Sequence, residues 1–108
     1  MGDEAIITSL SGTNRSSDKG KPRYDLISLV LLRRWAIHMA RNVESKGEAN
    51  WRNACTQEDI DRAKQSAFRH FLDWFEGKTD EDHAAALMFN VGLAEEAKEK
   101  RDGKEKAP

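Results

Sequence analysis

Two runs of helical periodicity on either side of Gly77 constrain the fold of this chain more than any other feature. Between residues 57 and 76, apolar side chains recur every three or four positions, as on one face of an α-helix: Ile60, Ala63, Ala67, Phe71 and Trp74. Residues 80–98 repeat this spacing with Ala84, Leu87, Val91 and Ala94. Because glycine is favoured just past the end of a helix, Gly77 predicts the turn of a helix–turn–helix unit.

The starts of these two helices carry side chains that can satisfy free backbone N–H groups. Thr56, followed three residues later by Asp59, resembles a capping box, and Thr79 with Asp82 repeats the pattern. We therefore expect one helix over residues 57–76 and another from position 80 to about position 98.

Another helix is predicted nearer the N-terminus, from Leu26 or Ser28 to Lys46, with Gly47 as its stop. Its apolar residues cover more than one face: Leu26, Ile27, Leu29, Val30, Leu31, Leu32, Trp35, Ala36, Ile37, Met39, Ala40 and Val43. A helix that is apolar nearly all round must be buried on several sides. In so small a domain, this predicts a central helix or a subunit interface.

These elements predict an all-α fold, a compact helical bundle of three to four main helices that associates with itself. Only Ala5–Thr8 has the character of a strand, and it is short. With 108 residues, the chain is expected to form one domain. It divides into an irregular N-terminal arm (1–22), a helical domain (23–98) and a charged flexible tail (99–108).

The charge balance narrows the classes of partner. Charged residues make up 34% of the chain, yet the formal net charge is only −1, so no basic excess favours DNA, and DNA binding is not expected. We see no basic leader and no apolar run long enough to cross a bilayer, which predicts no membrane attachment. The single Cys55 cannot form an internal disulfide, which fits the reducing cytoplasm.

The stretch from Arg69 to Gly77 contains the residue best suited to proton transfer. His70 has Asp73 three positions later, close enough on a helix for the imidazole to donate to the carboxylate, which raises its basicity. His70 is thus a candidate proton-transfer or phosphate-binding group. A helix-packing histidine in a surface ion pair explains the same pattern, and this alternative stays open.

Acidic residues open the last predicted helix at positions 80–82. Carboxylates there interact favourably with the helix dipole, which is one explanation. They also suit Mg²⁺, which often takes one or two protein carboxylates together with substrate phosphates. Farther along, Asn90 shares a helix face with His83 and needs a hydrogen-bond partner if it is buried. It is either a satisfied core asparagine or a group that holds His83 or a ligand.

Candidates for nucleotide recognition are scattered along the chain. Trp51, after Asn50, lies in a polar loop, where an indole can stack on a nucleobase or plug the end of a core. Lys21, Arg23 and Arg69 can meet a polyphosphate, although scattered cations are usually only solvated.

Taken in order, a set of short motifs resembles a known family. The motifs are Gly12-Thr13-Asn14-Arg15, Gly20-Lys21-Pro22-Arg23-Tyr24-Asp25-Leu26-Ile27, Asn50-Trp51, Ala67-Phe68-Arg69-His70, Gly77 with Asp80, and Asp82-His83-Ala84-Ala85-Ala86-Leu87-Met88-Phe89-Asn90. Over about residues 12–95, the chain resembles the small phage-associated dATP/dGTP diphosphohydrolase-type domain, which is related to the all-α MazG-like nucleoside triphosphate pyrophosphohydrolases. The acids of Asp73-x-x-Glu76 and of Glu96-x-x-Glu99 are loosely similar to the paired carboxylates of that group.

The resemblance implies an all-α protein, a dimer in preference to a larger oligomer, in the cytoplasm of a prokaryote or of a phage-infected host. Its reaction is the Mg²⁺-dependent attack of water on a purine (deoxy)nucleoside triphosphate, giving the monophosphate and pyrophosphate. The site residues that it implies are Asp80 and Asp82 for the metal, His70 and His83 for catalysis, and Lys21, Arg23, Asn50, Trp51, Arg69 and Asn90 for the nucleotide.

Two functions from different classes remain. The first is the nucleoside triphosphate pyrophosphohydrolase. The MazG-like group holds its metals with a Glu-x-x-Glu pattern, whereas Glu44 is the only acid between Leu26 and Lys46 here. This departure supports the second function, a catalytically silent phage or prophage accessory protein that binds a nucleotide or a host protein through its apolar first helix.

Overall fold

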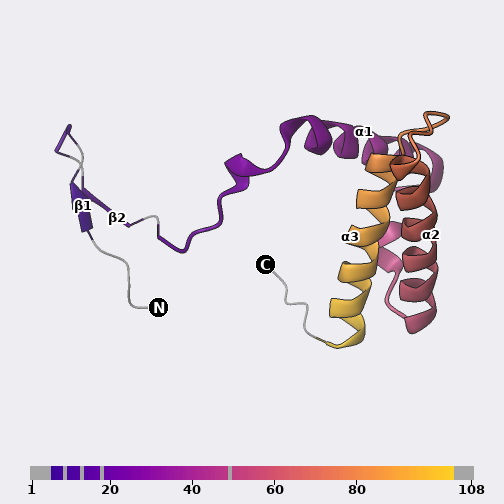
Figure 1. Ribbon diagram of the computed structural model, residues 1–108. Coiled ribbons are helices and arrows are strands. Elements are labelled where there is room, and N and C mark those ends of the chain that lie inside the picture. Colours follow the sequence, from indigo (N-terminus) through magenta and orange to yellow (C-terminus); the bar gives the residue numbers. More distant parts are fainter. Residues whose placement is uncertain (1–5, 9, 13, 18, 49, 104–108) are drawn as a thin grey trace.

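Three α-helices make up most of the protein in the computed structural model, which describes residues 6–8, 10–12, 14–17, 19–48 and 50–103 (Figure 1). They are α1 (Leu29–Lys46), α2 (Gln57–Phe75) and α3 (His83–Arg101). Two single-turn 3₁₀ helices, η1 (Tyr24–Leu26) and η2 (Trp51–Asn53), precede α1 and α2. The predicted all-α class is confirmed.

The core lies between α2 and α3, which form an antiparallel hairpin (Figure 1). In the part of the chain that is described, its buried apolar residues are Ile60, Ala63, Ala85, Ala86, Ala94 and Ala97. Alanine side chains let two helix backbones approach closely, so the two helices pack along their whole length. This core is thin, because Ile60 is its only buried apolar residue larger than alanine.

The start of α2 confirms the predicted capping box. The Thr56 hydroxyl accepts a hydrogen bond from the Asp59 amide at 3.1 Å, and the Asp59 carboxylate accepts from the Thr56 amide at 3.1 Å. At the other end, α2 stops at Phe75, and Gly77 follows with φ of 80°, a conformation that glycine adopts readily.

The expected start of α3 is wrong by one turn. The helix begins at His83, and Asp82 is its N-cap, with a carboxylate oxygen that accepts from the Ala85 amide at 3.1 Å. The predicted Thr79–Asp82 capping pair therefore does not form. An aspartate is as good an N-cap as a threonine, and a second partner of Asp82, described below, favours this choice.

The position of α1 departs most from expectation. Its backbone packs on α3, where Trp35 lies against Gly92, and does not come close to α2 in the described part of the chain. No residue of α1 is buried. The prediction of a central helix is therefore wrong for a single chain, and that of a subunit interface stays a prediction.

The C-terminal half of α2 is also more open than its pattern predicts. Phe71 is 41% exposed and Trp74 is 51% exposed, because α1 passes beside α3 instead of covering this face. The inward stripe of α2 is thus confirmed at Ile60 and Ala63 but not at these two aromatic residues.

Before η1, the arm contains a small antiparallel hairpin of β1 (Ile6–Thr8) and β2 (Asn14–Ser16), with Ile7 opposite Arg15. The arm is therefore not wholly irregular. This hairpin lies apart from the helices (Figure 1). At the other end, α3 continues to Arg101, three residues beyond its predicted end, and positions 104–108 of the predicted tail lie outside the described residues. Among the described helices, none has the length and apolar character needed to cross a membrane.

Candidate functional site

A hollow of the described structure, here called the main hollow, has a volume of about 570 Å³. It lies beside the α2–α3 hairpin, against η2, and falls in the size range of small-molecule sites. Four of the residues predicted to contact a nucleotide line it: Asn50, Trp51, Arg69 and Asn90. These four residues come from three separate segments of the chain, so the fold brings together what the sequence only suggested.

Arg69 supplies an available positive charge to this hollow. It is exposed, and no ion pair of Arg69 is found in the described part of the chain. Arg62, about two turns earlier on the same wall, pairs instead with Glu58 at 3.4 Å. A guanidinium without an acidic partner is suited to bidentate binding of a phosphate or carboxylate.

Asn90 and Trp51 are held in place by local contacts. The Asn90 side chain is buried and donates to the Ala86 carbonyl at 2.9 Å. This bond supports its interpretation as a satisfied core residue, although it also reaches the hollow wall. Trp51 is half-buried, and the Arg52 guanidinium carbon lies 4.5 Å from the centre of its ring. The guanidinium therefore covers one face of the indole ring in a cation–π contact.

The structure does not bring Lys21 and Arg23 to the main hollow. Both lie in the extended segment before η1, and both are exposed. Arg23 forms a two-point pair with Asp25, with distances of 2.9 and 2.8 Å. The positions of Lys21 and Arg23 therefore do not support their predicted role in phosphate binding.

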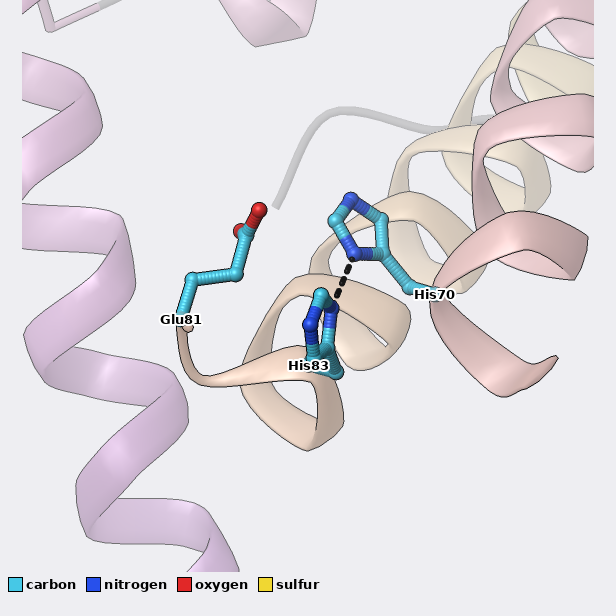
Figure 2. A group of neighbouring side chains, drawn as sticks. All are labelled: His70, Glu81 and His83. Atoms are coloured by element: carbon cyan, nitrogen blue, oxygen red, sulfur yellow. Dashed lines mark hydrogen bonds between the residues drawn. The ribbon is translucent and has the colours of Figure 1, made fainter. Parts of the chain in front are cut away.

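A second group of functional side chains, here called the histidine junction, lies where α2 meets α3. The Nδ1 atoms of His70 and His83 are 3.0 Å apart, and the Nε2 atom of His83 lies 2.7 Å from an oxygen of Asp80. Figure 2 shows the two imidazoles facing each other, with Glu81 beside them. The expected pair of His70 with Asp73 is not formed, since Asp73 instead lies 3.3 Å from the ammonium of Lys78.

The electrostatics of the histidine junction favour positive charge. The hydrogen bond to Asp80 raises the pKa of His83, and the same bond lowers the pKa of Asp80. In contrast, burial lowers the pKa of His38, an α1 histidine whose ring lies 5.4 Å from that of Phe89.

Asp82 has two protein partners. Arg34 of α1 binds both of its carboxylate oxygens, at 2.6 and 2.8 Å, and this guanidinium lowers the pKa of Asp82 to about 2. The same carboxylate caps α3. Since Asp80 is bonded to His83, the two carboxylates predicted to hold Mg²⁺ are both engaged by the protein in this arrangement, and their metal role stays a prediction.

Several side chains at these sites were not singled out by the sequence. Glu81 was read only as part of an acidic run, and His38 carried no pattern at all. A second hollow, of about 480 Å³, is lined by Trp35, Trp51, Gly92, Glu95, Glu96 and Glu99. Its acids include the Glu96-x-x-Glu99 pair, whose spacing was the available signal.

Fold and site together define a small all-α domain with a side hollow whose wall includes the exposed Arg69. The chain belongs to the family described as dATP/dGTP diphosphohydrolase, N-terminal, whose model matches residues 11–107. Neither the curated proteins nor the solved structures give a match.

Proposed function

We propose that this protein is a Mg²⁺-dependent (deoxy)nucleoside triphosphate pyrophosphohydrolase that takes purine deoxynucleotides. The observation that carries the proposal is the meeting of Asn50, Trp51, Arg69 and Asn90 at the main hollow, in a chain of the dATP/dGTP diphosphohydrolase family. In the reaction, a water oxygen attacks the α-phosphorus, the bond from this phosphorus to the bridging oxygen breaks, and pyrophosphate leaves.

The arrangement suits a nucleotide whose base lies near Trp51 and whose phosphates lie near Arg69. Asn90 and His83 are seven residues apart on α3, a rise of about 10 Å. A bound triphosphate can therefore extend from the hollow toward the histidine junction. There His70 or His83 would orient the attacking water, as general bases do when they lie within hydrogen-bond reach.

Mg²⁺ supplies charge neutralisation for the triphosphate in this reaction. It prefers oxygen ligands. One carboxylate oxygen of Asp80 is bonded to His83, whereas both oxygens of Asp82 are bonded to Arg34, so Asp80 offers an oxygen more readily than Asp82 does. Glu95 and Glu99, which line the second hollow, have no ion pair in the described part of the chain. They are the alternative carboxylates for the ion.

Nucleotide binding is tested by titrating the full chain with dATP and dGTP and following tryptophan fluorescence or heat. We expect Trp51→Ala to weaken binding about tenfold or more, since stacking of a base on an aromatic ring contributes ~1–3 kcal/mol. Arg69→Ala should have an effect of the same order. Arg33→Ala, an exposed cation of α1 away from the hollow, is the matched control and should bind as the parent does. Equal affinity of all four proteins would contradict the proposal.

Catalysis is tested separately, by release of pyrophosphate with each dNTP and Mg²⁺. Binding without turnover would support the alternative, a catalytically silent accessory protein. The lack of a Glu-x-x-Glu pair on α1 favours this alternative.

We further propose that a second copy of this chain covers its exposed apolar surface. Only one apolar residue larger than alanine is buried in the described core, and so small a core does not by itself stabilise a chain of this length. Large apolar residues lie exposed on α1 and the C-terminal half of α2: Leu29, Val30, Leu32, Ile37, Phe68, Phe71, Leu72, Trp74 and Phe75.

Light scattering on the purified chain tests this assembly, with an expected mass of twice that of one chain. Val30→Asp places a charge on the exposed face and should produce monomers. Lys64→Asp, at an exposed polar position of α2, should not. A parent protein that is monomeric at every concentration would overturn the proposal.

A further inference from the structure

The histidine junction collects the ligand types that transition metals prefer. One ligand atom from each of His70, Glu81 and His83 lies within 4.8 Å of the other two. The three residues belong to α2, to the α2–α3 turn and to the first turn of α3. The packing of the hairpin therefore creates the cluster, and no local sequence pattern does so.

The geometry at His83 is that of an oriented metal ligand. Its side chain is buried, with the residue only 4% exposed. Its Nε2 atom faces the Asp80 carboxylate at 2.7 Å, so Nε2 carries a hydrogen, and in the neutral imidazole the Nδ1 lone pair is directed at His70. Metal-bound histidines usually donate their second ring N–H to a carboxylate in this way.

The distance between the two imidazole nitrogens also fits the binding of both to one metal ion. Two nitrogens bound to one ion at ~2.1 Å, with a ligand–metal–ligand angle of about 90–110°, are about 3.0–3.4 Å apart. The observed separation between the two Nδ1 atoms is 3.0 Å. In the metal-free protein one imidazole donates a hydrogen bond to the other, and an ion that binds both nitrogens releases this proton to the solvent.

We propose that His70, His83 and Glu81 bind one transition-metal ion of the Zn²⁺ or Co²⁺ type. Two imidazoles and one carboxylate suit such borderline ions, whereas Mg²⁺ prefers ligand sets made of oxygen. Asp80 positions His83. Asp73, with a carboxylate oxygen 3.9 Å from His83 Nδ1, adds negative charge at the edge of the site.

Three protein ligands leave coordination positions for water or an anion. A hollow of about 300 Å³ reaches the site and is lined by Glu81 and His83 together with the cations Arg34 and Lys78. Such a cleft admits an ion and a phosphate oxygen. The metal site does not depend on the proposed nucleotide function, because its ligands lie outside the lining of the main hollow.

The test uses the full chain without an affinity tag, stripped with a chelator and titrated with Co²⁺ and Zn²⁺ in the absence of nucleotide. We expect one ion per chain by calorimetry, Co²⁺ absorption bands of a nitrogen–oxygen site, and no comparable heat with Mg²⁺. His70→Ala should abolish binding, and Glu81→Gln should weaken it at least tenfold.

Two controls separate ligand loss from damage to the fold. Glu58→Gln, an exposed acid at the other end of α2, and His38→Gln should bind Co²⁺ as the parent does. Glu81 is exposed and outside the helices, so Glu81→Gln should keep its helical circular dichroism. The proposal is overturned if the parent binds no Co²⁺ or Zn²⁺, or if both ligand variants bind as tightly as the controls. Either result leaves the dATP and dGTP titrations unaffected, so failure here is distinguishable from failure of the nucleotide site.

Discussion

The α2–α3 hairpin and α1 differ in how their apolar residues are used. In the hairpin, small residues on facing helices form the buried core, and the histidine junction and part of the main hollow lie on it. Helix α1 has more apolar residues, and larger ones, yet none of them is buried. The hydrophobic content of a helix therefore does not decide whether it lies inside the chain, because burial needs a facing surface of matching shape.

This difference has a functional consequence. Side chains that must meet within hydrogen-bond distance, such as His70 and His83, are placed by the most tightly packed pair of helices. The exposed face of α1 is free to take up a second copy. The hairpin thus carries much of the candidate site, and α1 provides the proposed interface.

The largest difference between the hairpin and α1 is expected in the free energy of unfolding when one isoleucine in each is replaced by alanine. Ile60→Ala deletes buried carbon from the hairpin core and should lower the free energy of unfolding by about 2–4 kcal/mol. Ile37→Ala, at a position 46% exposed on α1, should cost less than about 1 kcal/mol in a monomer. Urea unfolding at low protein concentration measures both. Equal losses would show that α1 is as buried as the hairpin.

The ion pair between the two regions should have an intermediate effect. Asp82→Ala removes both the α3 cap and the partner of Arg34 and should cost about 1–2 kcal/mol. Asp82→Asn keeps a good capping group and should lose less.

The same pair predicts a pH dependence. The pKa of Asp82 lies at about 2 in the folded protein, against 3.8 for an unperturbed aspartate. A lowered pKa contributes stability above pH 4 that is lost as the pH falls from 4 to 2. Since the carboxylate is 31% and the guanidinium 46% exposed, screening reduces this contribution to about 1 kcal/mol. Unfolding curves of the parent and Asp82→Asn should converge by that amount over this range, and a constant difference between them would contradict the pairing.

The smallest effects are expected from the same substitution at two glycines, with opposite signs. Gly77→Ala forces a side chain onto a residue with φ of 80° and should destabilise by about 1 kcal/mol. Gly92→Ala lies inside α3, where its new Cβ would be 3.5 Å from a Trp35 ring carbon, an ordinary contact. It should stabilise by about 0.5–1 kcal/mol through helix propensity. Thermal unfolding should show shifts of a few degrees in opposite directions. A lower melting temperature for Gly92→Ala would mean that α1 packs more tightly on α3 than this contact indicates.

Features that depend on neighbouring residues were predictable. The three helices and the Thr56 capping box follow from periodicity and spacing over a few positions. The candidates Asn50, Trp51, Arg69 and Asn90 were also found in advance, although their meeting at one hollow was not. The N-cap of α3 was predicted at Thr79 and lies instead at Asp82, because Asp82 also binds Arg34, which is 48 residues away in the sequence.

The sequence by itself determined the all-α class, the ends of α1 and α2 to within a few residues, and the supply of histidines, acids and cations near Gly77. Only the tertiary structure decided that His70 meets His83 instead of Asp73, that Glu81 joins them, and that α1 packs on α3 while none of its residues is buried. Local pattern fixes which face of a helix is apolar. The register between packed helices, which places atoms within 3 Å of one another, arises from contacts between distant residues and cannot be read from spacing alone.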